Sequence, residues 1–334
     1  MKLVSFLKNG KDCPGLISQD KVYDISMLQS GLPDSMNGIL SRWDEVIPQL
    51  HYLSKEIESS SKIRSRGLEF IEVNFLAPVP HPPSLRDGYS FRQHVETARR
   101  NRGMEMINVF DSYPVFYFGN HNTLKGPGPI KCMPDHFKKL DFELEAAIVI
   151  SNKGENIRAD DADKYIAGLM IMNDFSARTL QMDEMLLNLG PAKGKDFVTT
   201  TGPWLVTQDE LIKYETTCKD NHTGKSWNLN MSASVNGKKV SRGNLSDMEW
   251  TFAELIERAS YGVELYPGDV IGSGTVGTGC FLELNGTGKL NNPEYAEQWL
   301  QPDDLIELTI EGLGSLKNNI LKELTDHSIL QLKK

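Results

Sequence analysis

The sequence predicts an α+β fold that is mainly β. Short alternating or apolar segments, separated by turn residues, open the chain and fill most of its second half. Asn236-Gly237, the dipeptide most typical of a tight β-hairpin, lies between two alternating segments within residues 231–240. Helical spacing of apolar residues is confined to a few stretches, of which residues 39–50 are the first. We therefore expect a small N-terminal α+β domain, residues 1–72, and a larger, mostly β domain, residues 73–334.

The N-terminal region is predicted to begin with three short strands, at residues 3–7, 15–18 and 21–25. A helix follows, and Pro48 is expected to break it because proline cannot donate a backbone hydrogen bond. Residues 56–66 are polar and rich in Ser and Lys, which is typical of a linker or a loose helix end. No chemistry is evident in this part of the sequence.

Residues 70–79 are predicted to form a strand that ends at a series of prolines, which keep the chain extended. Residues 91–106 follow a helix-compatible pattern and carry a basic patch formed by Arg92, His94, Arg99, Arg100 and Arg102. A solvated helix face would account for this patch. Asp87 and Tyr89 lie just before it, however, and a site for an anionic substrate requires such a mixture of acid, base and hydroxyl groups.

Residues 140–150, LDFELEAAIVI, are predicted to form one strand that enters the core, because their second half is wholly apolar. Side chains alternate along a strand, so Asp141, Glu143 and Glu145 would share one face, spaced by roughly 6.5 to 7 Å. A solvated acidic face is one explanation of this row. The other is a divalent cation, since clustered carboxylates at the edge of a core are otherwise costly to desolvate.

The second half of the chain adds further strands and one well-marked helix. A helix near Asp160 is expected to end before the apolar residues 167–172, which lead into another acid, Asp174. Residues 246–249 read as a capping box, which predicts a helix that stops at Gly262. Strands are expected at residues 270–271 and 305–310.

Composition describes an ordinary soluble globular protein, with 334 residues, of which 39% are hydrophobic and 24% charged. The net charge of -9 argues against nucleic acid or an anionic membrane as a partner. The first residues lack the features of a signal peptide, and no apolar run is long enough to span a membrane, so a cytoplasmic protein is expected. The four cysteines form no CxxC pair and are expected to be free thiols. The glycine-rich residues 272–279 lack the Lys-Ser/Thr of a phosphate loop, so no nucleotide site is expected.

Six short blocks with acidic, basic or glycine residues follow one another along the chain. They are DGYSFRQH (87–94), DFELE (141–145), MNDFSAR (172–178), GKDF (194–197), YPGD (266–269), and Gly274-Thr275 with Glu283 beyond. In order and spacing these blocks resemble the fumarylacetoacetate hydrolase family, and the match covers residues from about 75 to 315. One block alone is weak, but six in sequence are highly specific.

This resemblance implies a mixed β-roll catalytic domain over residues 73–334, a divalent cation and a homodimer. It implies an enzyme that hydrolyses a carbon-carbon bond in a small-molecule β-diketo acid. The substrate would be fumarylacetoacetate, an intermediate of tyrosine degradation, cleaved to fumarate and acetoacetate, or a related acylpyruvate such as fumarylpyruvate. A 2-oxo acid decarboxylase or a hydratase or other lyase with the same metal site is the alternative. A metal-containing binding protein without turnover is a third possibility.

Carried over residue by residue, the resemblance assigns the metal ligands to Asp87, Glu143, Glu145 and Asp174. Four carboxylates suit Mg²⁺ or Ca²⁺, with Mn²⁺ as a further candidate, whereas zinc prefers His or Cys. Asp141 is placed outside the ligand set.

The resemblance also implies that His94 and Glu283 form a dyad, in which the carboxylate fixes the imidazole tautomer and neutral His94 takes a proton from water. Oxyanion and leaving-group stabilisation would come from Arg178, Gln181 and Lys195. Substrate contacts would come from Tyr89, Tyr117, Thr275 and Arg102. Taken singly, these residues have simpler explanations: a structural His94, an ordinary strand charge at Glu283, a solvated Lys195 and a turn at Thr275.

Two positions depart from the fumarylacetoacetase branch of the family. Met185 stands where that branch has a tyrosine, and Gly103 falls near a substrate arginine, which leaves Arg102 or Arg99 as candidates. Both positions concern substrate recognition, so they bear on the identity of the substrate and not on the reaction class.

Overall fold

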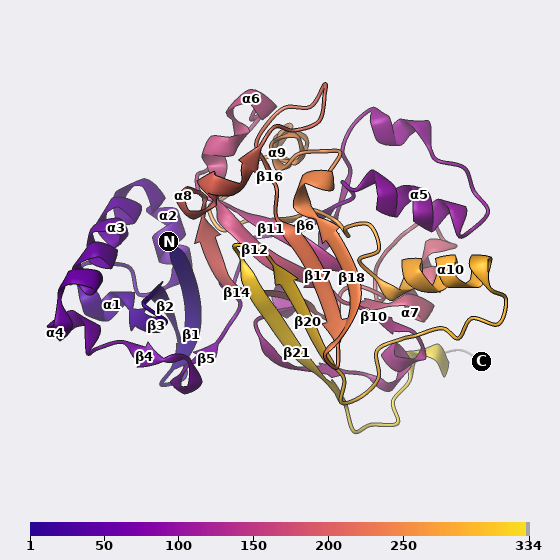
Figure 1. The fold of residues 1–334 in the computed structure, drawn as a ribbon, viewed down its shortest axis with the longest axis horizontal. Coiled ribbons are helices and arrows are strands. Elements are labelled where there is room, and N and C mark those ends of the chain that lie inside the picture. The colour runs from indigo at the N-terminus through magenta and orange to yellow at the C-terminus, as the bar shows by residue number, and fades with distance from the viewer. Residues whose placement is uncertain (332–334) are drawn as a thin grey trace.

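The computed structural model describes residues 1–331 and confirms the predicted α+β fold, with 32% strand and 31% helix (Figure 1). Two large sheets build the core. Ten strands of the larger sheet run in the order β4 (Leu68–Glu69), β3 (Lys21–Asp24), β2 (Lys11–Ser18), β1 (Lys2–Lys8), β14 (Thr199–Thr207), β12 (Ile166–Asp174), β11 (Leu144–Ile150), β19 (Val270–Gly272), β6 (Leu85–Gly88) and β7 (Phe116–Gly119). Two short strands join it at β1 and β14, namely β5 (Asn74–Phe75) and β8 (Leu124–Lys125).

The second sheet has five strands, in the order β18 (Lys238–Asn244), β17 (Asn230–Val235), β20 (Leu305–Ile310), β21 (Gly314–Lys322) and β9 (Gly128–Cys132). The predicted hairpin at its edge is confirmed. Asn236 and Gly237 both have positive φ, 51° and 76°, as a two-residue type I′ turn between paired strands requires. Two small ladders complete the strands, formed by β10 (Leu140–Asp141) with β13 (Ser176–Ala177) and by β15 (Glu215–Thr216) with β16 (Ser226–Trp227).

The helices are short apart from one in the N-terminal region. They are α1 (Ile25–Leu28), α2 (Met36–Ser41), α3 (Trp43–Ser59), α4 (Ser61–Arg64), α5 (Arg92–Arg100), α6 (Ala159–Ala162), α7 (Arg178–Met185), α8 (Gln208–Leu211), α9 (Phe252–Ser260) and α10 (Phe281–Asn291). Within residues 1–331, no helix combines the length and the apolar character needed to cross a membrane.

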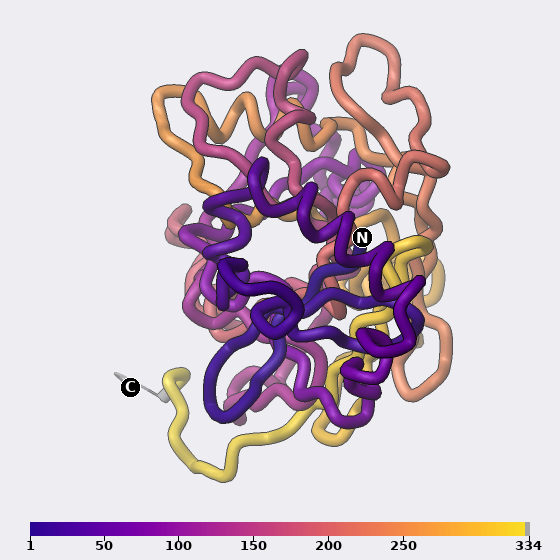
Figure 2. Tube along the Cα trace, turned by 90° about the vertical axis from the view of Figure 1, so that its left-hand side faces the viewer, coloured from indigo at the N-terminus to yellow at the C-terminus, as the bar shows by residue number. Residues whose placement is uncertain are grey.

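The N-terminal strands extend the large sheet, because Lys2 and Leu3 of β1 pair with Val206 and Leu205 of β14. Figure 2 views the molecule from the left-hand side of Figure 1, and the indigo N-terminal segment lies in front of the rest of the chain. The expected break at Pro48 is wrong, since α3 continues through it. Its buried residues, Val46, Leu50, Leu53 and Ile57, follow helical spacing, so packing of this face outweighs the missing hydrogen bond.

Strands β11 and β12 form the centre of the core, and every one of their residues is buried. The single strand predicted over residues 140–150 is interrupted, however. Leu140 and Asp141 pair with β13, whereas residues from Leu144 onward pair with β12. The Asp141 carboxylate accepts the N–H of Phe142, which turns the backbone between the two short segments.

Three other predicted boundaries are wrong for local reasons. Only Asn74–Phe75 of the strand predicted at 70–79 forms, because the Glu72 carboxylate accepts the N–H of Glu69 and closes a turn. The helix predicted over 91–106 ends at Arg100, and Gly103 follows with a φ of +70°.

The third error concerns the capping box. Thr251 and Glu254 form it, whereas Ser246 lies in a short 3₁₀ turn that Asn244 caps. The helix itself, α9, is present, and Gly262 follows its end with a φ of +64°. On the side of the molecule opposite α1 to α4, Figure 1 shows α5, α7 and α10 together. These three helices surround the site described next.

Candidate active site

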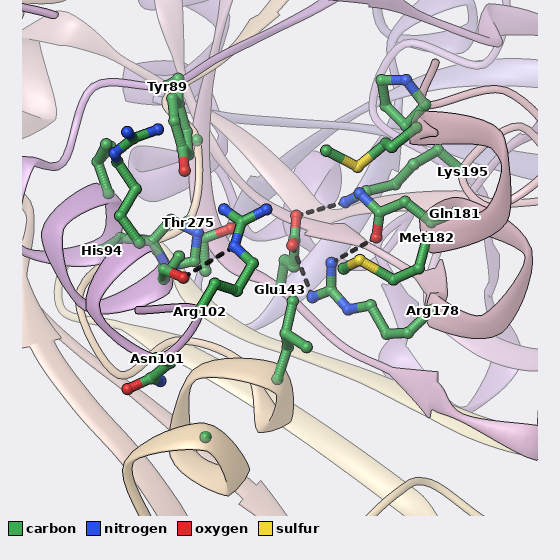
Figure 3. Close-up of a pocket in the computed structure, with 18 of the residues that line it drawn as sticks. Tyr89, His94, Asn101, Arg102, Glu143, Arg178, Gln181, Met182, Lys195 and Thr275 are labelled. Atoms are coloured by element: carbon green, nitrogen blue, oxygen red, sulfur yellow. Dashed lines mark hydrogen bonds and ion pairs between the residues drawn. The ribbon is translucent and has the colours of Figure 1, made fainter. Parts of the chain in front are cut away.

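A cavity of about 710 Å³ lies between α5, α7 and α10 and the adjoining strand ends. Ten of the candidate residues line it: Asp87, Tyr89, His94, Arg102, Tyr117, Glu143, Arg178, Gln181, Lys195 and Thr275. Apolar side chains also contribute, namely Met104, Ile107, Val115, Met182, Met185 and Trp299. Figure 3 shows the polar side chains arranged around Glu143, with His94 and Tyr89 on one side and Lys195, Gln181 and Arg178 on the other.

The fold gathers four buried carboxylates at the inner end of this cavity. Oxygen atoms of Asp87, Glu143, Glu145 and Asp174 lie within 4.8 Å of one another. Asp87 and Glu145 come from β6 and β11, which flank the short strand β19. Gly272 of β19 has to be glycine, because a Cβ there would lie 2.5 Å from Asp87 Oδ1. The absence of a side chain lets the two carboxylates approach across the strand.

Backbone groups hold two of these carboxylates in place. The N–H of Gly274 donates to Asp87 Oδ1 and to Glu145 Oε2, each at 3.1 Å. Burial, followed by repulsion from Asp174, raises the pKa of Asp87 to about 8. Burial and repulsion from Asp87 raise the pKa of Glu145 well above its usual value. No cationic side chain pairs with either residue among residues 1–331, so the ionised form of each carboxyl group lacks a partner and the protonated form is favoured in the metal-free protein.

Lys195 forms ion pairs with the other two carboxylates of the cluster, Glu143 and Asp174. Its Nζ lies 2.5 Å from Glu143 Oε2 and 2.5 Å from Asp174 Oδ2. Burial acts to raise the pKa of Glu143, but Lys195 and Arg178 outweigh it and hold this pKa below its usual range. Burial is the largest influence on Asp174, whose pKa is raised despite Lys195. The predicted site lysine is therefore part of the acidic cluster and not a solvated loop residue.

The charge balance of this centre fits a divalent cation. Five buried carboxylates, those of the cluster and Asp141, face two buried cations, Lys195 and Arg178. An excess of negative charge in a buried site is normally relieved by a hard metal ion bound through oxygen. Asp87 and Glu145 would be its main ligands, with Glu143 and Asp174 beside them.

The predicted dyad also comes together, across 189 residues of sequence. His94 Nδ1 lies 2.8 Å from Glu283 Oε2, and both side chains are buried. Glu283 Oε1 accepts the N–H of Thr278. Because an ionised carboxylate only accepts, Nδ1 carries the hydrogen and Nε2 of neutral His94 is left to accept a proton. Glu283 lies in the first turn of α10, so reading it as a strand charge was wrong.

The Arg178 guanidinium is engaged by acceptors of the protein itself. It donates to Asp141 and Glu143, and its Nη1 donates to Gln181 Oε1 at 2.9 Å. The last contact orients the Gln181 amide so that its two N–H donors point away from Arg178. Arg178 thereby holds Gln181 and Glu143 in place beside Lys195, and the Gln181 N–H groups are not taken up by this contact.

Asp141, which the sequence placed outside the ligand set, connects two parts of the site: the helix that carries Glu283 and the helix that carries Arg178. It is fully buried and accepts the N–H groups of Phe281 and Leu282, which open α10, as well as the Arg178 guanidinium. It thereby holds the helix of Glu283 against the helix of Arg178. Its place in the acidic row of residues 141–145 was the available signal, but only the packed fold shows its partners.

Replacing Asp141 by asparagine should therefore destabilise the protein by about 3 kcal/mol, the usual cost of breaking a buried ion pair. Thermal unfolding measured with and without metal would show the loss. Asp161, an exposed residue that forms a surface ion pair with Lys164, supplies the control, and Asp161→Asn should change stability by less than about 0.5 kcal/mol. Equal stability of the two variants would contradict the linking role.

The four predicted substrate contacts lie around the cavity but differ in what they touch. The Tyr117 hydroxyl donates to Asp174, and the Thr275 hydroxyl donates to Glu145 at 3.4 Å, so both brace the carboxylate cluster. The ring of Tyr89 packs edge-on against His94, with ring centroids 5.7 Å apart. Arg102 also lines the cavity, and among residues 1–331 its side chain donates to the carbonyl of Ala98 alone.

Sequence reasoning missed the outer wall of the cavity. Lys139, Lys289 and Trp299 line it, and both lysines lie near Glu297, at 3.6 and 2.6 Å. They stand outside every recognised block, so nothing in the local sequence marked them.

The carboxylate cluster also predicts how metal binding should depend on pH. In the unfolded chain Asp87 ionises near pH 4, whereas in the metal-free folded protein it keeps its proton up to about pH 8. The folded state thus binds more protons in this window, and its stability should fall as the pH rises from 5 to 8. A metal ion displaces that proton, so the rise in melting temperature on adding Mg²⁺ should be larger at pH 8 than at pH 5. A rise that does not change with pH would contradict this assignment.

Comparison with known proteins agrees with this geometry. The family model described as fumarylacetoacetate (FAA) hydrolase C-terminal matches residues 84–321. Oxaloacetate tautomerase YisK of Bacillus subtilis is 27% identical over 315 residues, which make up 91% of this chain and 94% of that protein. The fumarylacetoacetate hydrolase of Exiguobacterium antarcticum has a TM-score of 0.70 at 23% identity, covering 97% of this chain and 100% of its own.

A further solved structure shows a metal in the same fold. Maleylpyruvate hydrolase from Sphingobium sp. SYK-6, in complex with a manganese(II) ion and pyruvate, has a TM-score of 0.68 at 18% identity. The match covers 96% of this chain and 99% of that chain. At such identities the two structures show the fold alone. The case for a divalent metal site in this chain therefore rests on its own buried carboxylate cluster.

Proposed function

Because the chain belongs to the fumarylacetoacetate hydrolase family, a family of enzymes, we propose that it hydrolyses a carbon-carbon bond in a β-diketo acid. The observation that carries this proposal is the His94–Glu283 pair beside the four-carboxylate cluster in one cavity. A homodimer and a cytoplasmic location, both expected from the sequence, belong to the same proposal.

His94 acts as the general base. Its Nε2 takes a proton from water while Glu283 stabilises the imidazolium through Nδ1–H. The resulting hydroxide attacks the substrate carbonyl, and the N–H donors of Gln181 and Lys195 meet the negative charge that develops. A divalent cation held by the carboxylates would polarise the diketone oxygens and favour departure of the enolate. His94 then returns the proton to the departing carbon fragment.

The cavity favours a substrate longer than a four-carbon acid. Its volume of about 710 Å³ lies well within the range of sites for drug-sized ligands. Arg99 and Arg102 line the cavity and form no ion pair among the described residues, so they can bind a second carboxylate. Fumarylacetoacetate and fumarylpyruvate have such a carboxylate at the far end of the chain.

Oxaloacetate tautomerisation is the second candidate, because the relative YisK, which spans most of this chain, carries that name. The same His94 could move a proton between the carbon and oxygen of a keto-enol pair, with no water added. Decarboxylation of a 2-oxo acid and hydration are further alternatives for the same metal site.

A panel of fumarylacetoacetate, fumarylpyruvate, acetylpyruvate and oxaloacetate, run with Mg²⁺ and with chelator, tests the proposal. Hydrolysis yields two acids, one of which contains oxygen from labelled water, and it should stop when the metal is removed. Faster enol-keto exchange of oxaloacetate without cleavage of any diketo acid would establish the tautomerase instead. Release of carbon dioxide would point to the decarboxylase.

A further inference from the structure

A second group of metal-ligating side chains lies beside the carboxylate cluster. His94, Cys280 and Glu283 are all buried, and one ligand atom of each lies within 4.8 Å of those of the other two. Nitrogen, sulfur and oxygen donors therefore converge at the hydrogen bond that joins His94 to Glu283. His94 also lines the cavity, which gives an ion a path to this place from solvent.

The donors of this group differ in kind from the four carboxylates. A thiolate and an imidazole favour zinc, cadmium or cobalt, whereas a set of carboxylate oxygens favours magnesium, calcium or manganese. Zinc bonds nitrogen and oxygen at about 2.0 Å and sulfur at about 2.3 Å, so its tetrahedral ligand atoms lie roughly 3.3 to 3.7 Å apart. Shifts of about 1 Å in side chains would bring the three donors to that spacing.

The Cys280 thiol does not cap helix α10. Cys280 occupies the position just before the helix, yet its side chain makes no capping hydrogen bond. Asp141 accepts the first N–H groups of the helix in its place. The thiol instead lies next to His94 and Glu283.

We propose that His94, Cys280 and Glu283 form an inhibitory site for a soft divalent cation such as zinc. The ion takes the place of the proton between His94 Nδ1 and Glu283, and this proton passes through solvent to Nε2 of the same ring, while the thiol proton leaves to solvent. His94 stays neutral, carries its hydrogen on Nε2 and can no longer accept a proton there. Metal binding follows from the donor geometry alone, whereas inhibition also rests on the proposed function.

Cobalt(II) tests the binding without any assay of activity. When Co²⁺ is added to protein saturated with Mg²⁺, we expect the near-ultraviolet absorption band that a cobalt-thiolate bond produces. The band should disappear in Cys280→Ser and persist in Cys218→Ser, since the Cys218 thiol instead contacts the carbonyl of His222. X-ray absorption of the unsubstituted protein loaded with zinc should show one sulfur ligand at about 2.3 Å. A zinc shell of oxygen and nitrogen only would overturn the proposal, whether or not the variants fold.

Zinc titration in the presence of saturating Mg²⁺ tests the inhibition. Cys280→Ser should require at least tenfold more Zn²⁺ for half-inhibition than the unsubstituted protein, each measured against its own uninhibited rate. Equal inhibition of both would place the zinc at the carboxylate cluster and overturn the proposal. A cobalt-thiolate band without inhibition by zinc would support the site and instead contradict the role of His94 as base.

Discussion

Replacement of His94 by glutamine is expected to lower kcat by about 10²- to 10⁴-fold, the usual contribution of a positioned general base. Glutamine keeps the size and polarity of the side chain but cannot take a proton. Its effect on metal binding should be small, because His94 is not among the four carboxylates. Steady-state kinetics on the best substrate of the panel, with Mg²⁺ affinity measured in parallel, would distinguish loss of the general base from loss of metal binding.

His81 provides the matched control for this variant. It is an exposed histidine whose ring contacts Asp12 and which does not line the cavity, so His81→Gln should leave kcat unchanged. Glu283→Gln should also lower kcat, since an amide no longer holds Nδ1–H in place. The double variant of His94 and Glu283 should be no slower than His94→Gln alone, because the two residues act as one unit. Activity of His94→Gln close to that of the unsubstituted enzyme would rule out the proposed base.

The second large effect should come from the carboxylate cluster, where two glutamates that look equivalent in sequence are expected to behave in opposite ways. Glu145→Gln and Glu143→Gln should both abolish metal-dependent turnover, since each removes a charged ligand. Their effects on the metal-free protein should differ in sign. Burial and repulsion from Asp87 raise the pKa of Glu145, whereas Lys195 and Arg178 keep the pKa of Glu143 low despite its burial.

The raised pKa of Glu145 means that metal-free folding has to keep a proton on this group, and glutamine removes that cost, so the chelated Glu145→Gln protein should unfold at a higher temperature than the chelated unsubstituted protein. A gain of about 1 kcal/mol corresponds to one unit of pKa shift. Glu143→Gln leaves Lys195 and Arg178 short of a partner and should cost about 3 to 5 kcal/mol. Melting curves at pH 8 in chelator would test the pair, and a shift in the same direction for both would contradict the charge distribution described above.

Much of this architecture could be predicted from local sequence. The Asn236-Gly237 turn requires two positive φ angles that few other dipeptides tolerate, so the hairpin followed directly. The apolar residues of β11 predicted a buried strand because a run without polar residues cannot face water. The boundaries were less predictable. Thr251 and Glu254 cap α9 in preference to Ser246 and Glu249, and the choice depended on where the helix could pack.

By itself, the sequence determined which chemical groups are present and which blocks contain them: four candidate ligands, a histidine and a distant glutamate. Only the tertiary structure decided how they pair. Lys195 lies between Glu143 and Asp174, and Glu283 reaches His94 across 189 residues, because packed strands and helices bring together segments that have no local relation. Asp141 shows this most clearly. It was one carboxylate in an acidic row, and burial against Arg178 and the start of α10 made it the link between the two halves of the site.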